Sequence, residues 1–142
     1  MSDEKETSIL GRSFICNEDL RVSTHAGEPG FLARILLPSY RSLPLSCIER
    51  IDLRVDGAVV DPQDITLILN GYSHKLDEMG HLSKIFWFIL DKADLFIKRK
   101  EPLGLGDHVL EGTMVVVEPY MTVGRFALNY TAKRQLSVAT DI

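Results

Sequence analysis

The segment IERIDLRVDGAVV at residues 48–60 decides the fold class of this chain. From Ile51 to Val55, apolar side chains at every second position alternate with charged ones, so an extended chain carries the two kinds on opposite faces. Asp56 and Gly57 follow, and an Asp-Gly pair tolerates the positive φ angles of a tight hairpin turn. The segment therefore predicts a β-hairpin with one apolar and one charged face.

Residues 61–76, DPQDITLILNGYSHKL, repeat this pattern. Pro62 closes a turn, an apolar strand follows at residues 65–69, and Asn70 and Gly71 supply a second hairpin turn before the partner strand. Further strands are predicted at residues 31–38, 85–90, 94–98 and 109–120, and within residues 134–138.

Two of these strands carry specific expectations about burial. Residues 31–38, FLARILLP, are apolar at almost every position except Arg34, which predicts that both faces of the strand are covered. Residues 85–90, IFWFIL, are aromatic and β-branched, which predicts a buried strand. Trp87 and its aromatic neighbours are then expected in the core rather than in a sugar-stacking platform. Residues 76–84, LDEMGHLSK, could form one helical turn.

The spacing of the turns and the near absence of helical periodicity predict an all-β protein. We expect a single-domain antiparallel β-sandwich of jelly-roll-like form over residues 9–142, after a disordered polar tail at residues 1–8. A chain of 142 residues suits one domain that buries its own core.

Charge and cysteine content exclude several classes of function. The net charge of -4 argues against a nucleic-acid binder, and the one basic strip, residues 97–102, contains Glu101 and is typical of a solvated edge or turn. No apolar run approaches the roughly 20 residues that span a bilayer. The N-terminus has no apolar leader, so we expect a cytoplasmic protein that binds no membrane. Cys16 and Cys47 are expected to be reduced packing thiols, although a single bridge between them stays open.

The most metal-like cluster lies in HKLDEMGH, residues 74–81. His74, Asp77, Glu78 and His81 offer imidazole and carboxylate groups that suit Zn, Mn or Fe. Their spacing matches neither a helical His-x-x-x-His pair nor the ligand pattern of cupin-type barrels. We therefore expect no metal and no other cofactor in this chain.

Nucleophilic and phosphate-binding motifs do not occur in this sequence. There is no G-x-S-x-G, no Cys in a recognisable reactive context, and the GLG within residues 103–106 precedes no helix. His25 and His108 lie in loop-like surroundings, which favours solvated or capping roles. No self-contained active site can be derived from these residues.

The connection LPSYRSLPLSC at residues 37–47 is stiffened by two prolines. Pro38 and Pro44 each fix φ and bias the preceding residue towards extended geometry. The loop between them is therefore preformed and presents Tyr40 and Arg41 at a low ordering cost.

Six short elements occur along the chain as an ordered set. They are Pro38-x-Tyr40-Arg41-x-x-Pro44-Leu45-Ser46, Val55-Asp56-Gly57, Leu76-Asp77-Glu78-Met79, Phe86-Trp87-Phe88, Gly104-Leu105-Gly106-Asp107-His108 and Tyr120-Met121. No single element is specific, but the set resembles the small β subunit of the bacterial C-glycoside deglycosidases. The resemblance covers roughly residues 31–121, and it departs from the family pattern at His74 and in the unusually apolar FWFILDK segment.

The resemblance implies a division of labour between two subunits. In such enzymes a larger α subunit looks like a TIM barrel that carries a divalent metal, usually Mn, and the acid and base residues. The reaction cleaves the C–C bond between a 3-oxo-sugar and an aromatic aglycone, because the ketone acidifies the neighbouring C2 proton and an enolate-type intermediate can expel the aglycone. This chain would be the non-catalytic β-sandwich beside the barrel mouth, in a hetero-oligomer of one or several αβ units, and would meet the C-glycoside only within that complex.

We expect the partner interface or pocket rim at Tyr40, Arg41, Tyr120 and Met121, because Tyr, Arg and Met are enriched in protein interfaces. An alternative for Tyr40 is that it plugs the end of the sandwich. An alternative for the whole chain is a stand-alone β-sandwich module that binds carbohydrate or protein. A weaker third hypothesis is an enzyme that uses the cluster at residues 74–81.

Overall fold

The computed structural model describes residues 13–39, 41–117 and 127–139, and strands are the main regular structure in them. The strands are β1 (Leu20–His25), β2 (Glu28–Ile35), β3 (Leu43–Pro44), β4 (Ile48–Val55), β5 (Ala58–Val59), β6 (Ile65–Leu69), β7 (Tyr72–Lys75), β8 (Phe86–Trp87), β9 (Ala93–Lys98), β10 (Gly106–Val117) and β11 (Ala127–Ala139). Three short 3₁₀ helices are η1 (Leu45–Cys47), η2 (Pro62–Asp64) and η3 (Leu76–His81).

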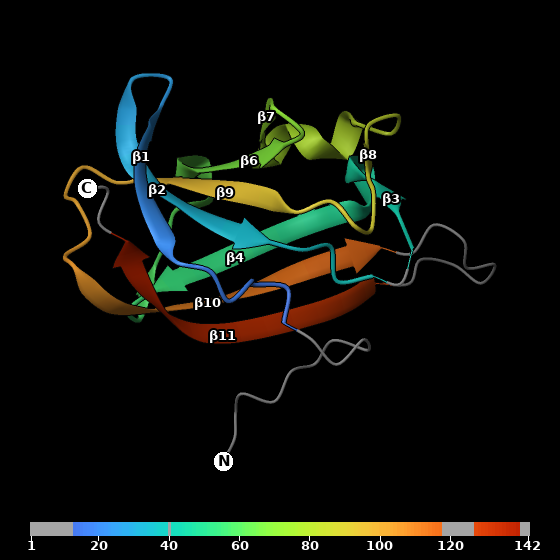
Figure 1. Cartoon of the computed structure of the whole chain (residues 1–142). Helices are drawn as coiled ribbons and strands as arrows, with labels where there is room; N and C mark the ends of the chain where they lie inside the picture. Colours follow the sequence, from blue (N-terminus) through green and yellow to red (C-terminus); the bar gives the residue numbers. More distant parts are fainter. Residues whose placement is uncertain (1–12, 40, 118–126, 140–142) are drawn as a thin grey trace, which may run out of the picture.

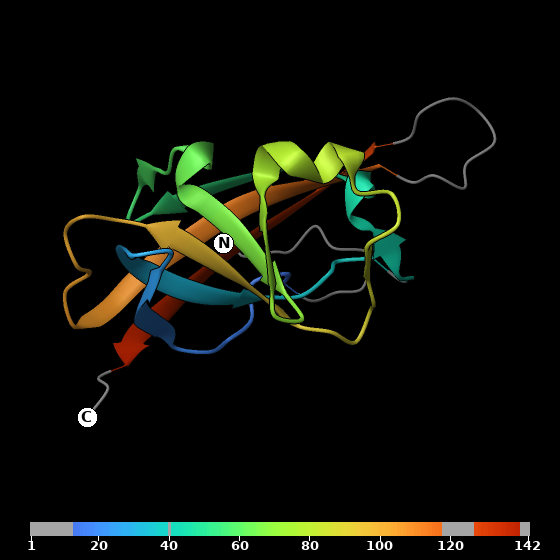
Figure 2. The ribbon, with the colours of Figure 1, turned by 90° about the horizontal axis from the view of Figure 1, so that it is seen from above.

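Nine of these strands form one curled sheet in the order β5-β4-β10-β11-β1-β2-β9-β6-β7. All neighbours pair antiparallel except β1 and β11, which run parallel where the sheet turns from one layer to the other. Figures 1 and 2 show the layer with β4, β10 and β11 facing the layer with β2, β9 and β6. The all-β prediction is confirmed, with a curled mixed sheet in which a parallel pair links the two layers.

The hairpin turns follow the predicted turn chemistry. Asp56 and Gly57 between β4 and β5, and Asn70 and Gly71 between β6 and β7, all have positive φ. A third hairpin joins β1 and β2 through Ala26 and Gly27, also at positive φ. The expectation that His25 lies in a loop was wrong, because His25 is the last residue of β1 and pairs with Glu28, so only Ala26 and Gly27 form the turn.

The core is one cluster between the two layers. It gathers the alternating apolar residues of β4 with those of β2, β6, β9, β10 and β11, and Trp87 and Tyr130 are among its largest members. Cys16 and Cys47 are both buried and no disulfide joins them, as predicted. Burial raises the pKa of the Cys16 thiol, which keeps it in the neutral form.

The outer face of β2 is not covered by another layer, contrary to the expectation for residues 31–38. Arg34 is only partly buried there and donates through Nε to Asp94 Oδ1 at 2.8 Å. Arg21 of β1 reaches the same carboxylate oxygen at 2.7 Å. The single charged residue of this apolar segment is thus explained by an ion-pair cluster across β1, β2 and β9.

β10 and β11 form the longest ladder in the described part of the chain, with paired residues from Gly106 opposite Val138 to Val117 opposite Ala127. The strand expected within residues 134–138 is therefore much longer than predicted. None of the helices in the described residues is long and apolar enough to cross a membrane.

Candidate functional site

The proline-bracketed loop, residues 38–44, lies at one end of the sandwich. Pro38 and Ser39 are buried, and Ser39 Oγ accepts a hydrogen bond from the Arg41 backbone N–H at 3.3 Å. Arg41 itself is exposed. Of the other residues predicted for the interface, Tyr40, Tyr120 and Met121 lie outside the described part of the chain, so their predicted roles stay predictions.

The same loop is bonded to the aromatic segment at residues 85–91. Leu43 of β3 pairs with Trp87 of β8, Ser42 Oγ accepts from the Ile89 N–H at 2.8 Å, and the Leu45 N–H donates to the Ile85 carbonyl at 2.8 Å. Residues 42–45 and 85–89, which are far apart in the sequence, are therefore joined by hydrogen bonds. They lie at the end of the molecule where Figure 1 shows β3 and β8.

The aromatic segment is not the buried strand that its composition predicted. Trp87 is fully buried and its Nε1–H donates to the Asp91 carbonyl at 2.8 Å, but its neighbours face outward. Phe88 is 55% exposed and Leu90 is 87% exposed. The reason is topological. In the described part of the chain, β8 pairs with the two-residue β3 in a small separate sheet and is not a member of the nine-stranded sheet. One residue of the segment, Trp87, therefore reaches the core.

We call the four outward residues the aromatic strip: Ile85, Phe86, Phe88 and Leu90. The rings of Phe86 and Phe88 stack with their centroids 6.2 Å apart. Neighbouring exposed apolar residues on a backbone held by several hydrogen bonds are typical of interaction surfaces rather than of ordinary solvated surface. Arg41, one of the residues predicted for the interface, directly precedes Ser42, which is hydrogen-bonded to the segment that carries the strip. The composition of the segment predicted instead that the residues of the strip lie in the core.

The metal-like residues of the sequence are not brought together. His74 is buried in β7, where its Nε2 has no hydrogen-bond partner among the described residues, whereas Asp77, Glu78 and His81 are exposed on η3. No group of three or more His, Cys, Asp or Glu in the part of the chain that the structure describes could hold a metal ion. The cluster at residues 74–81 therefore does not fit a divalent metal.

Two of the signature elements meet through His108. Its Nδ1 lies 2.7 Å from Asp56 Oδ2 and its Nε2 lies 2.7 Å from the Gly104 carbonyl, and the Val109 N–H donates to Asp56 Oδ1. Both ring nitrogens face acceptors, so a doubly protonated ring can donate to both. The Asp56 carboxylate, followed by the Gly104 carbonyl, raises the pKa of His108. We call this arrangement the His108 clasp; it fixes the end of the loop that follows β9.

Comparison with known proteins assigns the family. Residues 10–120 match the family model described as the C-glycoside deglycosidase beta subunit. The chain belongs to this family. The matched region contains the proline-bracketed loop, the aromatic strip and the His108 clasp, and it ends before β11.

Individual relatives agree with this family. A "3'-dehydrocarminate deglycosidase beta subunit" from Microbacterium sp is 36% identical over 98 residues, which is 69% of this chain and 74% of the relative. A "C-glycoside deglycosidase beta subunit" from Eubacterium cellulosolvens is 33% identical over 65% of this chain and 63% of its own length. Another from Arthrobacter globiformis is 29% identical over 48% of this chain and 52% of its own length.

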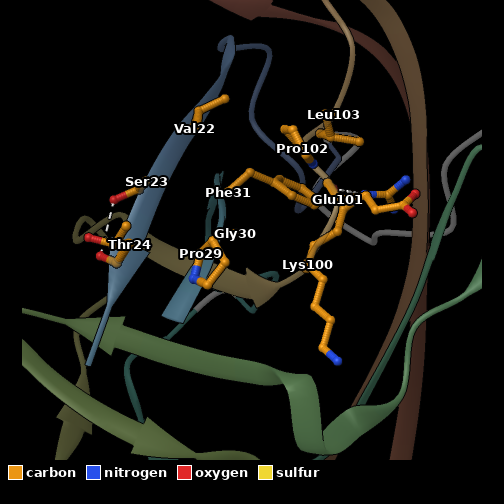
Figure 3. Close-up of a pocket in the computed structure, with 11 residues that line it drawn as sticks. Val22, Ser23, Thr24, Pro29, Gly30, Phe31, Lys100, Glu101, Pro102 and Leu103 are labelled. Atoms are coloured by element: carbon orange, nitrogen blue, oxygen red, sulfur yellow. Dashed lines mark hydrogen bonds between the residues drawn. The ribbon is translucent and has the colours of Figure 1, made fainter. Parts of the chain in front are cut away.

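A pocket of about 460 Å³ lies at the opposite end of the sandwich, between β1, β2 and the loop after β9. Figure 3 shows Val22 and Phe31 on the strands and Pro102 and Leu103 on the loop around this space. The sequence indicated no cavity here, because its lining comes from segments about 70 residues apart.

Proposed function

We propose that this chain is the β subunit of a heteromeric C-glycoside deglycosidase, a carbon–carbon lyase that cleaves the bond between a 3-oxo-sugar and an aromatic aglycone. The observation that carries the proposal is the family match over residues 10–120, which includes most of the ordered signature elements. The names of the relatives, each a deglycosidase beta subunit, support a role beside at least one other subunit.

In this proposal the partner subunit carries the chemistry. We expect it to be a TIM-barrel α subunit with the acid and base residues, and its divalent metal, expected to be Mn, would supply electrostatic stabilisation to the developing oxyanion. The present chain would contribute binding surface and order, and its described residues offer no ligand set for that metal.

The aromatic strip and Arg41 form the surface of this chain that we expect to bind the α subunit. Aromatic and Arg side chains are enriched among the energetic anchors of interfaces. The backbone that carries them is held by Trp87 and by hydrogen bonds to Ser42 and Leu45, so little conformational entropy remains to be lost on docking.

Co-expression of the chain with the barrel protein encoded beside it tests the proposal. We expect a stable complex in size-exclusion chromatography, and release of aglycone from a 3-oxo-C-glycoside by the complex but by neither subunit alone. A lone monomer that fails to bind the barrel protein, together with saturable binding in a titration against a panel of sugars, would instead support the stand-alone module.

A further inference from the structure

The pocket of about 460 Å³ exists because the inner face of the β1–β2 hairpin extends beyond the facing layer. Val22 pairs with Phe31 across the hairpin, so both side chains are on the core side. Phe31 is buried, but Val22 is 56% exposed, since none of the described strands covers it there. Residues 99–103 line the other side of this open end, and a hollow remains between their side chains and the hairpin.

Both sides of the hollow are fixed by specific contacts. On one side the Arg99 N–H donates to the Pro29 carbonyl at 2.9 Å, and on the other His108 holds the Gly104 carbonyl. The strands approach closely at Gly30, where a Cβ would lie 2.2 Å from the Ile97 carbonyl oxygen. The pocket is therefore a preformed feature of the backbone.

The lining combines an apolar wall with a cation. Val22, Pro29 and Pro102 provide exposed apolar surface. Arg99 also lines the pocket; its Nε donates to the Glu101 carbonyl at 2.9 Å, and its terminal nitrogens have no hydrogen-bond partner among the described residues.

The charges of the lining favour an anion. Among the lining residues, the two cations Arg99 and Lys100 outnumber the one anion, Glu101. Lys100 extends away from Phe31 and Leu103 in Figure 3, and Arg99 is the other cation of the lining. A guanidinium is planar and suits two-point recognition of a carboxylate.

We propose that this pocket binds a small aromatic carboxylate, with its ring against Val22, Pro29 and Pro102 and its carboxylate on the Arg99 guanidinium. A volume of about 460 Å³ lies within the range of small-molecule sites. The elements that line the site, β1, β2 and the loop after β9, lie at the opposite end of the molecule from β8 (Figure 1), so the site does not depend on the proposed docking to an α subunit.

This site is tested by titrating the full chain with 2-naphthoate. Isothermal titration calorimetry measures the affinity, and changes in the amide chemical shifts locate the binding site. We expect saturable binding with shifts at residues 22–24 and 99–103. The uncharged 2-naphthamide should bind more weakly, because it lacks the charge that Arg99 recognises.

Three variants should change the affinity for 2-naphthoate in three different ways. Arg99→Gln should weaken binding of 2-naphthoate about tenfold, because it removes a charge-assisted contact. Glu101→Gln should strengthen it about twofold by removing a like charge. Lys98→Gln, which removes a neighbouring cation outside the pocket lining, should leave the affinity unchanged.

The assignment is overturned if 2-naphthoate shows no saturation, if its shifts centre on Phe86 and Phe88 instead, or if Arg99→Gln binds as wild type does. Equal losses in Arg99→Gln and Lys98→Gln would also contradict it, because they would reduce the effect to general electrostatic attraction. Circular dichroism of each variant should show an unchanged spectrum, which separates a loss of binding from a loss of fold.

Discussion

At the end of the molecule that carries β3 and β8, apolar side chains point outward, whereas at the end that carries the β1–β2 hairpin they surround a hollow. A cation accompanies the apolar groups in both places, Arg41 at the first end and Arg99 at the second. The difference lies in the loops. Leu43 and Pro44 pair with the aromatic segment, whose Phe88 and Leu90 are exposed, whereas residues 99–103 join β2 through the Arg99–Pro29 hydrogen bond and line the hollow. Similar side chains thus give a surface suited to a macromolecule at one end and a cavity suited to a small molecule at the other.

The largest effect is expected from Trp87→Ala at the strip end. Trp87 is fully buried, fills the core beneath the strip and bonds to the Asp91 carbonyl, so its loss leaves a large cavity. The free energy of unfolding should fall by about 3–5 kcal/mol in urea titrations. A loss below about 1 kcal/mol would show that the strip is not anchored by this residue.

Gly30→Ala tests whether the pocket end depends on close strand approach. The new Cβ would lie 2.2 Å from the Ile97 carbonyl oxygen, so β2 and β9 must separate. We expect a loss of about 1–3 kcal/mol in the free energy of unfolding. The matched control is Gly80→Ala, because a Cβ at Gly80 meets nothing within 4 Å and its φ is not positive. Equal losses in both variants would contradict the steric explanation.

Phe88→Ser distinguishes the contribution of the outward side chains of the strip to partner binding from the contribution of Trp87 to stability. Phe88 is more than half exposed, so its replacement should change the free energy of unfolding by less than about 1 kcal/mol. If the strip docks the partner subunit, the Kd of the complex should rise about tenfold in calorimetric titrations. Val59→Ser is the control, since Val59 is 72% exposed on the edge strand β5. Unchanged affinity in Phe88→Ser would remove the strip from the interface.

The smallest effect concerns the pH dependence of the His108 clasp. The pKa of His108 is raised above its usual value of about 6.5, chiefly by the Asp56 carboxylate, so protonation of the folded state contributes stability. This contribution is present in full below about pH 6.5 and is lost as the pH rises through the raised pKa. The pKa of Asp56 is lowered, chiefly by His108, so the carboxylate stays charged over this range.

Thermal unfolding at pH 6 and at pH 9 measures how much the His108 clasp contributes to stability at each pH. Wild type should lose more stability between these values than His108→Gln, whose side chain does not titrate. The loop at residues 99–103 should loosen together with the clasp, because deprotonation leaves a ring nitrogen without a hydrogen facing an acceptor oxygen. Identical pH dependence in both proteins would show that the clasp is not maintained in solution.

The sequence alone determined the fold class and the family. Alternation from Ile51 to Val55 and the Asp-Gly and Asn-Gly turns are local properties, and local chemistry is enough to specify hairpins. The ordered signature elements were readable for the same reason, since each is short and contiguous. His25 shows the limit of that approach, because its loop-like surroundings in the sequence belong to the paired ends of β1 and β2.

Only the tertiary structure decided where the proposed binding surfaces lie. Composition could not tell Trp87 from Phe88, because burial depends on which side chain meets the core once β8 has paired with β3. Asp56 and His108 are 52 residues apart, and their contact arises when the β4–β5 turn meets the start of β10. The hollow beside Val22 likewise exists because one layer extends beyond the other. Such features depend on long-range packing between segments, which neither side-chain periodicity nor a short motif encodes.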